Sequence, residues 1–243
     1  MSATVRDVLW HLAAGFVLLA VLLAMPTAAL DLPVRFPVTG AAVYLAAVPL
    51  ILAVLPDHLP GDRFGPANAV TLVRLSATAV LSAALALAPG VLADARLEWF
   101  LAVLAIGAFI LDGVDGWIAR RAGVDSAFGA RFDMELDAFV TLVLAALVWR
   151  LDKAGAWVLA AGLLRYAFIG ASAFWPKLKT ELPPSNRRRF ACALMVGTLS
   201  VVVVPVIPPE VALPAVAAAL ALLVYSFAAD VAWLVKLAEN GRS

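Results

Sequence analysis

The sequence predicts an all-α polytopic membrane helix bundle with about eight spans, and three observations support this prediction. The 243 residues are 64% hydrophobic and have a mean hydropathy of +0.99, whereas a soluble domain is roughly half apolar. Apolar stretches of about 20 residues, the length that crosses a bilayer, recur along the chain. Short connections rich in proline and charged residues separate them.

The first apolar stretch follows Arg6 and resembles a signal peptide, but it is long for one and more spans follow, so we expect a retained helix. The fourth stretch is short and spans the bilayer only if it begins at Leu97 and tilts. The expected spans are 8–27, 37–55, 68–88, 97–113, 127–149, 154–175, 189–207 and 211–236.

The basic residues predict the orientation of the bundle. With a cytoplasmic N-terminus, thirteen of the 18 Lys and Arg residues lie on the cytoplasmic side and only four lie outside. All seven Trp fall near an expected span end, as in an aromatic belt. We therefore expect an integral protein of a bacterial cytoplasmic membrane, with both termini in the cytoplasm. The net charge of +1 gives no sign of a nucleic-acid partner.

Four aspartates are the most unusual feature of these spans. Asp112 and Asp115, in "DGVDGWIAR", are three residues apart, and Asp133 and Asp137 are four apart, so each pair shares a helix face. Asp133 and Asp137 lie roughly 10 and 17 Å into a helix that starts near Ser126. Carboxylates at that depth require an interior position and a counter-charge.

No Lys or Arg in these spans is placed to neutralise four carboxylates, which favours a site for two divalent cations. Oxygen ligands suit Mg²⁺ or Mn²⁺, and neither His nor Cys lies nearby to favour zinc. Mg²⁺ held by few carboxylates usually completes its shell with substrate phosphates. The expected site therefore lies on the cytoplasmic side and accepts a phosphate-bearing substrate.

Neighbouring residues fit a phosphate substrate but allow simpler interpretations. Gly116 and Gly129 have no Cβ, which permits close approach of a ligand or, equally, tight helix packing. Arg120 offers a planar fork to phosphate oxygens, although Arg120 and Arg121 alone are typical of a cytoplasmic membrane anchor.

The spacing of these residues resembles the signature of the CDP-alcohol phosphatidyltransferase family. Every position is filled in the pattern Asp112-x2-Asp115-Gly116-x2-Ala119-Arg120-x8-Gly129-x3-Asp133-x3-Asp137. Upstream, "PANAVTLVRL" resembles the family segment that opens its first core helix. The resemblance covers about 66–236 and implies a six-helix core, so we expect a catalytic domain over 61–243 and a two-helix transmembrane addition over 1–60.

The resemblance implies that the protein joins an alcohol to a phosphate group of a CDP-activated substrate and releases CMP. It makes Asp112, Asp115 and Asp133 metal ligands, and Asp137 a ligand or the base that deprotonates the acceptor hydroxyl. The residues implied to contact the nucleotide or its diphosphate are Asn68, Thr71, Arg74, Gly116, Ala119, Arg120 and Gly129. It also implies a homodimer.

The sequence says less about the substrates. We expect CDP-diacylglycerol as donor and a small polar alcohol as acceptor, because basic residues suited to a phosphorylated acceptor such as glycerol phosphate or inositol phosphate follow the sixth span. These are Lys177, Lys179, Arg187, Arg188 and Arg189. They equally suit contact with anionic headgroups of membrane lipids. Arg165, within the sixth span, either binds an acceptor or lipid phosphate or pairs with a carboxylate across the bundle.

The sequence departs from the family pattern at two places. "KLKT" at 177–180 is similar to a stretch of phosphatidylglycerophosphate synthases, but its continuation is not. Glu135, between the last two Asp, points about 200° away from Asp133 on a helix and is not expected to be a fifth ligand.

Three alternative functions stay open. Transfer from CDP-choline or CDP-ethanolamine to diacylglycerol is an alternative within the same chemistry. A transporter is disfavoured because the four Asp lie in one contiguous stretch without an inverted repeat, and an inactive homologue because all four are present.

Overall fold

The computed structural model describes residues 3–55, 63–122, 127–174 and 185–240, and every regular element in these ranges is a helix. The predicted all-α polytopic bundle is confirmed. The elements are α1 (Ala3–Ala29), α2 (Arg35–Ala53), α3 (Pro66–Ala84), α4 (Pro89–Leu92), α5 (Ala95–Ala122), α6 (Ala127–Arg150), the 3-10 turn η2 (Ala156–Leu159), α7 (Ala160–Phe174), α8 (Asn186–Val202) and α9 (Pro209–Asn240).

Several helix boundaries differ from the prediction. The fourth span does not end at 113, because α5 continues through the Asp and Gly residues to Ala122 without a proline to stop it. The sixth span begins later than 154, since a turn and η2 precede α7, and the seventh ends at Val202 rather than 207. The third ends at Ala84, ahead of α4.

Among the described residues, five helices are long and apolar enough to cross a membrane: α1, α2, α3, α5 and α9. The helical part from Ala156 to Ala171 is apolar but shorter. α6 has sufficient length, but its first half carries Arg131, Asp133, Glu135 and Asp137. The helix that contributes two of the four aspartates is therefore more polar in its first half than the five apolar helices.

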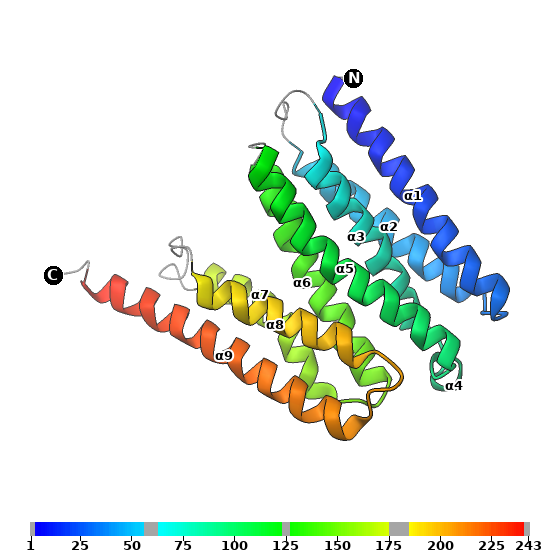
Figure 1. Cartoon of the computed structure of the whole chain (residues 1–243). Helices are drawn as coiled ribbons and strands as arrows, with labels where there is room; N and C mark the ends of the chain where they lie inside the picture. The colour runs from blue at the N-terminus through cyan, green and yellow to red at the C-terminus, as the bar shows by residue number, and fades with distance from the viewer. Residues whose placement is uncertain (1–2, 56–62, 123–126, 175–184, 241–243) are drawn as a thin grey trace.

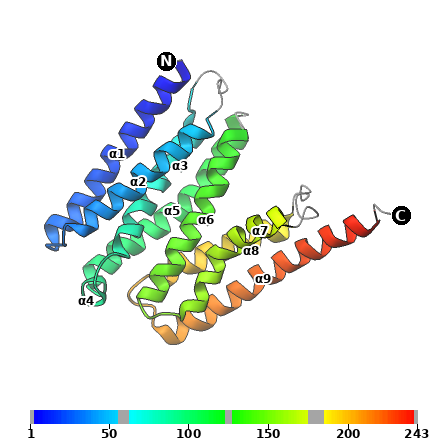
Figure 2. The same cartoon turned by 180° about the vertical axis from the view of Figure 1, so that it is seen from behind.

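The long helices run back and forth along the bundle (Figures 1 and 2). The N-terminus, the start of α3, the end of α5 and the start of α6 lie at one end. α8 and α9 are inclined to α1, α2 and α3, and the C-terminal half of α9 diverges from the other helices. We call the end at which α6 begins the splayed end.

Helix α3 lies at the centre and packs against α1, α2, α5 and α6. Its core-facing residues are mostly small, which lets neighbouring helices approach closely. The buried hydroxyls of Thr78 and Ser82 donate to backbone carbonyls one turn earlier, so they are satisfied within α3. Gly65 precedes the helix with φ of 83°, a conformation that favours glycine.

The two N-terminal helices are packed onto α3. The Tyr44 hydroxyl of α2 donates to the Leu12 carbonyl of α1 (2.8 Å), and Ser76 of α3 donates to the Gly15 carbonyl (3.0 Å). A Cβ on Gly15 would lie only 2.4 Å from the Tyr44 hydroxyl, so this three-helix contact requires glycine. The buried apolar core runs on from α1 and α2 into the later helices.

Helices α6 and α7 also approach each other closely at a glycine. A Cβ added to Gly162 would lie 2.5 Å from the Cα of Leu142. α6 ends in a Schellman arrangement: Lys153 N–H donates to Val148 and Asp152 N–H to Trp149, with Asp152 at φ of 54°. The Lys153 ammonium then donates to the Val204 carbonyl (2.7 Å), which ties this turn to the chain after α8.

Candidate functional site

Three helices bring one arginine and three aspartates together. Arg74 comes from α3, Asp112 from α5, and Asp133 and Asp137 from α6. By helical rise, these positions lie about 9–15 Å from the ends of their helices at the splayed end. Since the hydrocarbon of a membrane is about 30 Å thick, the cluster lies in one half of the bundle.

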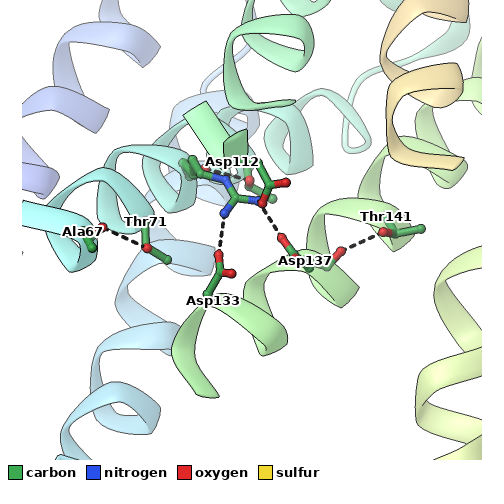
Figure 3. A network of polar contacts seen from close by, with 8 residues as sticks. Ala67, Thr71, Asp112, Asp133, Asp137 and Thr141 are labelled. Atoms are coloured by element: carbon green, nitrogen blue, oxygen red, sulfur yellow. Dashed lines mark hydrogen bonds and ion pairs between the residues drawn. The ribbon is translucent and has the colours of Figure 1, made fainter. Parts of the chain in front are cut away.

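The guanidinium of Arg74 is the centre of the cluster. Its Nη1 donates to Asp133 Oδ1 (2.6 Å), and its Nη2 contacts Asp137 Oδ1 (2.6 Å) and Asp112 Oδ1 (2.7 Å). The Arg74 side chain is 2% exposed, whereas those of the three aspartates are 34–45% exposed. The carboxylates are thus partly accessible, whereas the arginine is buried. Figure 3 shows Asp112, Asp133 and Asp137 pointing toward one another.

The carboxylates also have the geometry of a cation site. One oxygen from each of Asp112, Asp133 and Asp137 lies within 4.8 Å of the others. Among the described side chains, three carboxylates contact one guanidinium, so acidic groups outnumber the basic one. Carboxylate oxygens are the ligands that Mg²⁺ and Mn²⁺ prefer. The donor set and this excess of acidic groups therefore fit a divalent cation.

The expectation that no basic residue is placed to neutralise these aspartates is wrong. Arg74, for which the family resemblance implies only a position near the nucleotide, contacts three of them. The error has a physical cause: Arg74 is on α3, outside the stretch that holds the aspartates, and the packing of α3 against α5 and α6 brings it into the cluster.

The other two α3 residues expected near the nucleotide, Asn68 and Thr71, donate hydrogen bonds to backbone carbonyls four residues earlier. The Asn68 amide donates to the Phe64 carbonyl (2.5 Å), and the Thr71 hydroxyl donates to the Ala67 carbonyl (3.1 Å). Thr71 lies on the same side of α3 as the cluster, near Asp133 in Figure 3. Both side chains are almost fully buried, with 8% and 3% of their surface exposed.

Several expected site residues lie outside the part of the chain whose side chains are described. They are Asp115, Gly116, Ala119, Arg120, Lys177 and Lys179. The backbone of α5 continues as a helix through the first four of them. Gly129 is described and lies in the first turn of α6, one turn before Asp133.

Arg165, which had two interpretations, pairs with a carboxylate across the bundle. Its Nη2 donates to Glu135 Oε1 (2.5 Å), which joins α7 to α6. Glu135 points away from the cluster, as its position on the helix predicts. The contact does not by itself assign Arg165 to a substrate.

Arg187 and Arg188 converge on Asp230 of α9. Arg187 Nη2 donates to Asp230 Oδ1 (2.5 Å) and Arg188 Nη1 to Asp230 Oδ2 (3.1 Å), while the Ser226 carbonyl accepts from Arg187 (3.4 Å). Asp230 was not singled out in the sequence, although it is the one carboxylate in the span 211–236. An acidic residue inside a span signals a functional or paired position.

The comparison with known proteins agrees with the geometry. A family model described as CDP-alcohol phosphatidyltransferase matches residues 64–231. The match begins just before α3 and ends within α9, and it leaves α1 and α2 outside. No curated protein and no solved structure matches the chain.

Proposed function

The chain belongs to the CDP-alcohol phosphatidyltransferase family, and on that premise we propose that it transfers the phosphatidyl group of CDP-diacylglycerol to a small polar alcohol and releases CMP. The observation that supports this most strongly is the convergence of Asp112, Asp133 and Asp137 on Arg74. Three carboxylates from two helices, open on one side, match the needs of a reaction at a diphosphate.

In the proposed reaction the acceptor hydroxyl oxygen attacks the phosphorus that bears the diacylglycerol. A new P–O bond forms, the P–O bond to the bridging oxygen breaks, and CMP leaves with that oxygen. The hydroxyl proton passes to a carboxylate, for which Asp137 is the proposed base. Arg74 is proposed to position the carboxylates, since it holds one oxygen of each and leaves the other available.

Asp112, Asp133 and Asp137, together with Asp115, are the proposed ligands of Mg²⁺ or Mn²⁺ in a two-metal site. Such ions, when bound, neutralise the charge that develops on the leaving phosphate and align the reacting oxygens. Arg120, Gly116, Ala119 and Gly129 remain proposed contacts of the nucleotide, with Asn68 and Thr71 near the same pocket.

A phosphorylated acceptor is supported by the group formed by Arg187, Arg188 and Asp230. Two guanidinium groups converge there on one carboxylate. α8, which carries both arginines, packs against α5 and α6, the helices of the carboxylate cluster. Lys177 and Lys179 stay proposed members of this acceptor site. Arg165 is a weaker candidate because it is paired with Glu135.

The proposed setting follows from the distribution of charge and from the family. The protein is proposed to lie in a bacterial cytoplasmic membrane as a homodimer, with both termini and the carboxylate cluster on the cytoplasmic side. A lipid donor then reaches the cluster from the membrane while a polar acceptor arrives from the cytoplasm.

The test is a CMP-release assay on purified protein with Mg²⁺ or Mn²⁺, CDP-diacylglycerol and a panel of free and phosphorylated alcohols. CMP release with one acceptor supports the proposal, and a phosphorylated acceptor supports the role of Arg187 and Arg188. A parallel assay with CDP-choline and diacylglycerol tests the alternative. Turnover only in that second assay overturns the proposed donor.

A further inference from the structure

A groove of about 680 Å³ lies between α2 and the helices that carry the cluster. Residues of α2, α3, α6 and α7 line it, and nearly all of them are apolar. Phe128, Phe132 and Phe139 form the α6 wall, while Arg131 and Glu135 are the charged residues. Such a lining suits an amphiphile with a long apolar part.

One face of α2 forms the opposite wall. Val43, Ala46, Leu50 and Val54 line the groove at spacings of three and four residues, which is one stripe of a helix. Leu50 and Val54 are 70% and 48% exposed, so other described residues leave much of this stripe uncovered. α2 lies outside the 64–231 region that matches the family.

The groove and the carboxylate cluster share two helices as a common wall. On α3, Arg74 holds the aspartates and the next residue, Leu75, lines the groove. On α6, Asp133 lies in the cluster and the residue before it, Phe132, lines the groove. Since successive helical residues point about 100° apart, the two sites occupy adjacent faces of the same helices.

The groove has the length of one membrane leaflet. Its α6 residues run from Phe128 to Phe139, about 16 Å by helical rise, which is roughly half of the ~30 Å hydrocarbon thickness. It begins at the splayed end, where Arg131 supplies a positive charge near the first turn of α6, and it runs beside Asp133 and Asp137 to Phe139. A molecule that fits has an acyl chain in the groove and a polar head that reaches the cluster across the shared helices.

We propose that this groove binds an acyl chain of CDP-diacylglycerol, and that α2 supplies a wall that the family core does not provide. This inference rests on the proposed function, because it requires the phosphatidyl group to reach the cluster. It assigns to the N-terminal addition a role in lipid selection. α2 sets the width of the groove, and this width determines which acyl chains fit.

The first test is binding and needs no turnover. A CDP-diacylglycerol with a diazirine near the end of one acyl chain is cross-linked to wild-type protein, and the labelled peptides are identified. Labelling within 43–54 or 128–139 that excess CDP-diacylglycerol suppresses, and phosphatidylcholine does not, supports the proposal. Labelling elsewhere, labelling equally suppressed by phosphatidylcholine, or occupation of the groove by a second copy, seen as cross-links between chains, overturns it.

The second test is a matched pair of variants on α2. Ala46→Trp fills the groove, whereas Leu45→Trp places the same ring on an exposed residue outside it. We expect Ala46→Trp to raise KM for a long-chain donor about tenfold or more and to leave a short-chain donor unaffected. Leu45→Trp is expected to change neither. Equal losses with both donors, or the same loss in both variants, count against the groove.

The two tests separate this inference from the proposed function. If the lipid probe cross-links in the groove of wild-type protein but no donor yields CMP, acyl-chain binding in the groove is supported and the transferase proposal fails. If CMP is released while the label lies elsewhere, the reaction stands and the acyl-chain assignment fails.

Discussion

At the scale of single residues, the carboxylate cluster joins positions that are close in the sequence with one that is far away. Asp133 and Asp137 share a face because they are four residues apart on α6, and local sequence determines that. Arg74 joins them across about sixty residues of chain, and only the packing of α3 against α6 creates that contact. Asp230 was missed for the same reason, since its two arginines lie on another helix.

Asp137 is predicted to be essential for turnover. Asp137→Asn keeps an oxygen that accepts from Arg74 but cannot take a proton, so CMP release should fall about 10²- to 10⁴-fold at unchanged expression. Asp94→Asn is the matched control, because Asp94 is exposed, pairs with Arg96 and lies near the opposite end of the bundle. Near-normal turnover in Asp137→Asn would refute its role as the base.

Arg74 is predicted to stabilise the protein against repulsion among the aspartates. Arg74→Gln should lower the free energy of unfolding by about 1–3 kcal/mol, less than for a fully buried pair, because the carboxylates are 34–45% exposed. Mg²⁺ should restore part of the loss by replacing the missing positive charge.

The measurement is the melting temperature in detergent with added Mg²⁺ and with EDTA. Arg74→Lys, which keeps the charge but not the planar fork, should fall between wild type and Arg74→Gln. If added Mg²⁺ does not change the melting temperature of Arg74→Gln, the result argues against a cation site at these carboxylates.

At the scale of elements, the existence and order of the long helices followed from hydropathy, whereas several ends did not. The charged residues from Asp112 onward suggested that the fourth span stops, yet α5 continues to Ala122 because helix formation tolerates them. α7 starts late because the Schellman arrangement at Asp152 and the η2 turn come first. Such local backbone arrangements leave little trace in an apolar pattern.

Gly162 is predicted to control the distance between α6 and α7. Gly162→Ala would place a methyl group 2.5 Å from the Leu142 backbone, and overpacking of this kind costs about 1–3 kcal/mol. Gly170→Ala, on the same helix with no atom within 4 Å of the added methyl, is the control. Thermal unfolding of both variants in detergent compares them, and equal melting temperatures would contradict the close packing.

At the scale of the whole molecule, the all-α class was open to sequence reasoning. The way α1 and α2 attach was not. His11 of α1 lies against Phe64 (5.2 Å between ring centroids), and Phe64 against Phe128 of α6 (6.3 Å). These aromatic contacts join segments more than fifty residues apart, which no periodic pattern encodes.

The proposed orientation predicts which ends of the helices face the cytoplasm. In a Cys192→Ser background, Gly90→Cys in α4 should react with an impermeant maleimide in intact cells, because α4 lies at the end opposite the splayed end. Asn186→Cys at the start of α8 should react only after permeabilisation. The reverse labelling pattern would invert the topology and place the carboxylate cluster outside the cytoplasm.

The contact of Arg74 with the three aspartates has one more consequence. An arginine does not give up its proton at physiological pH, so an incoming ion has to share its ligands with a permanent competitor. The polypeptide can therefore insert and fold before any ion arrives, and it holds the ion less tightly than three bare carboxylates would.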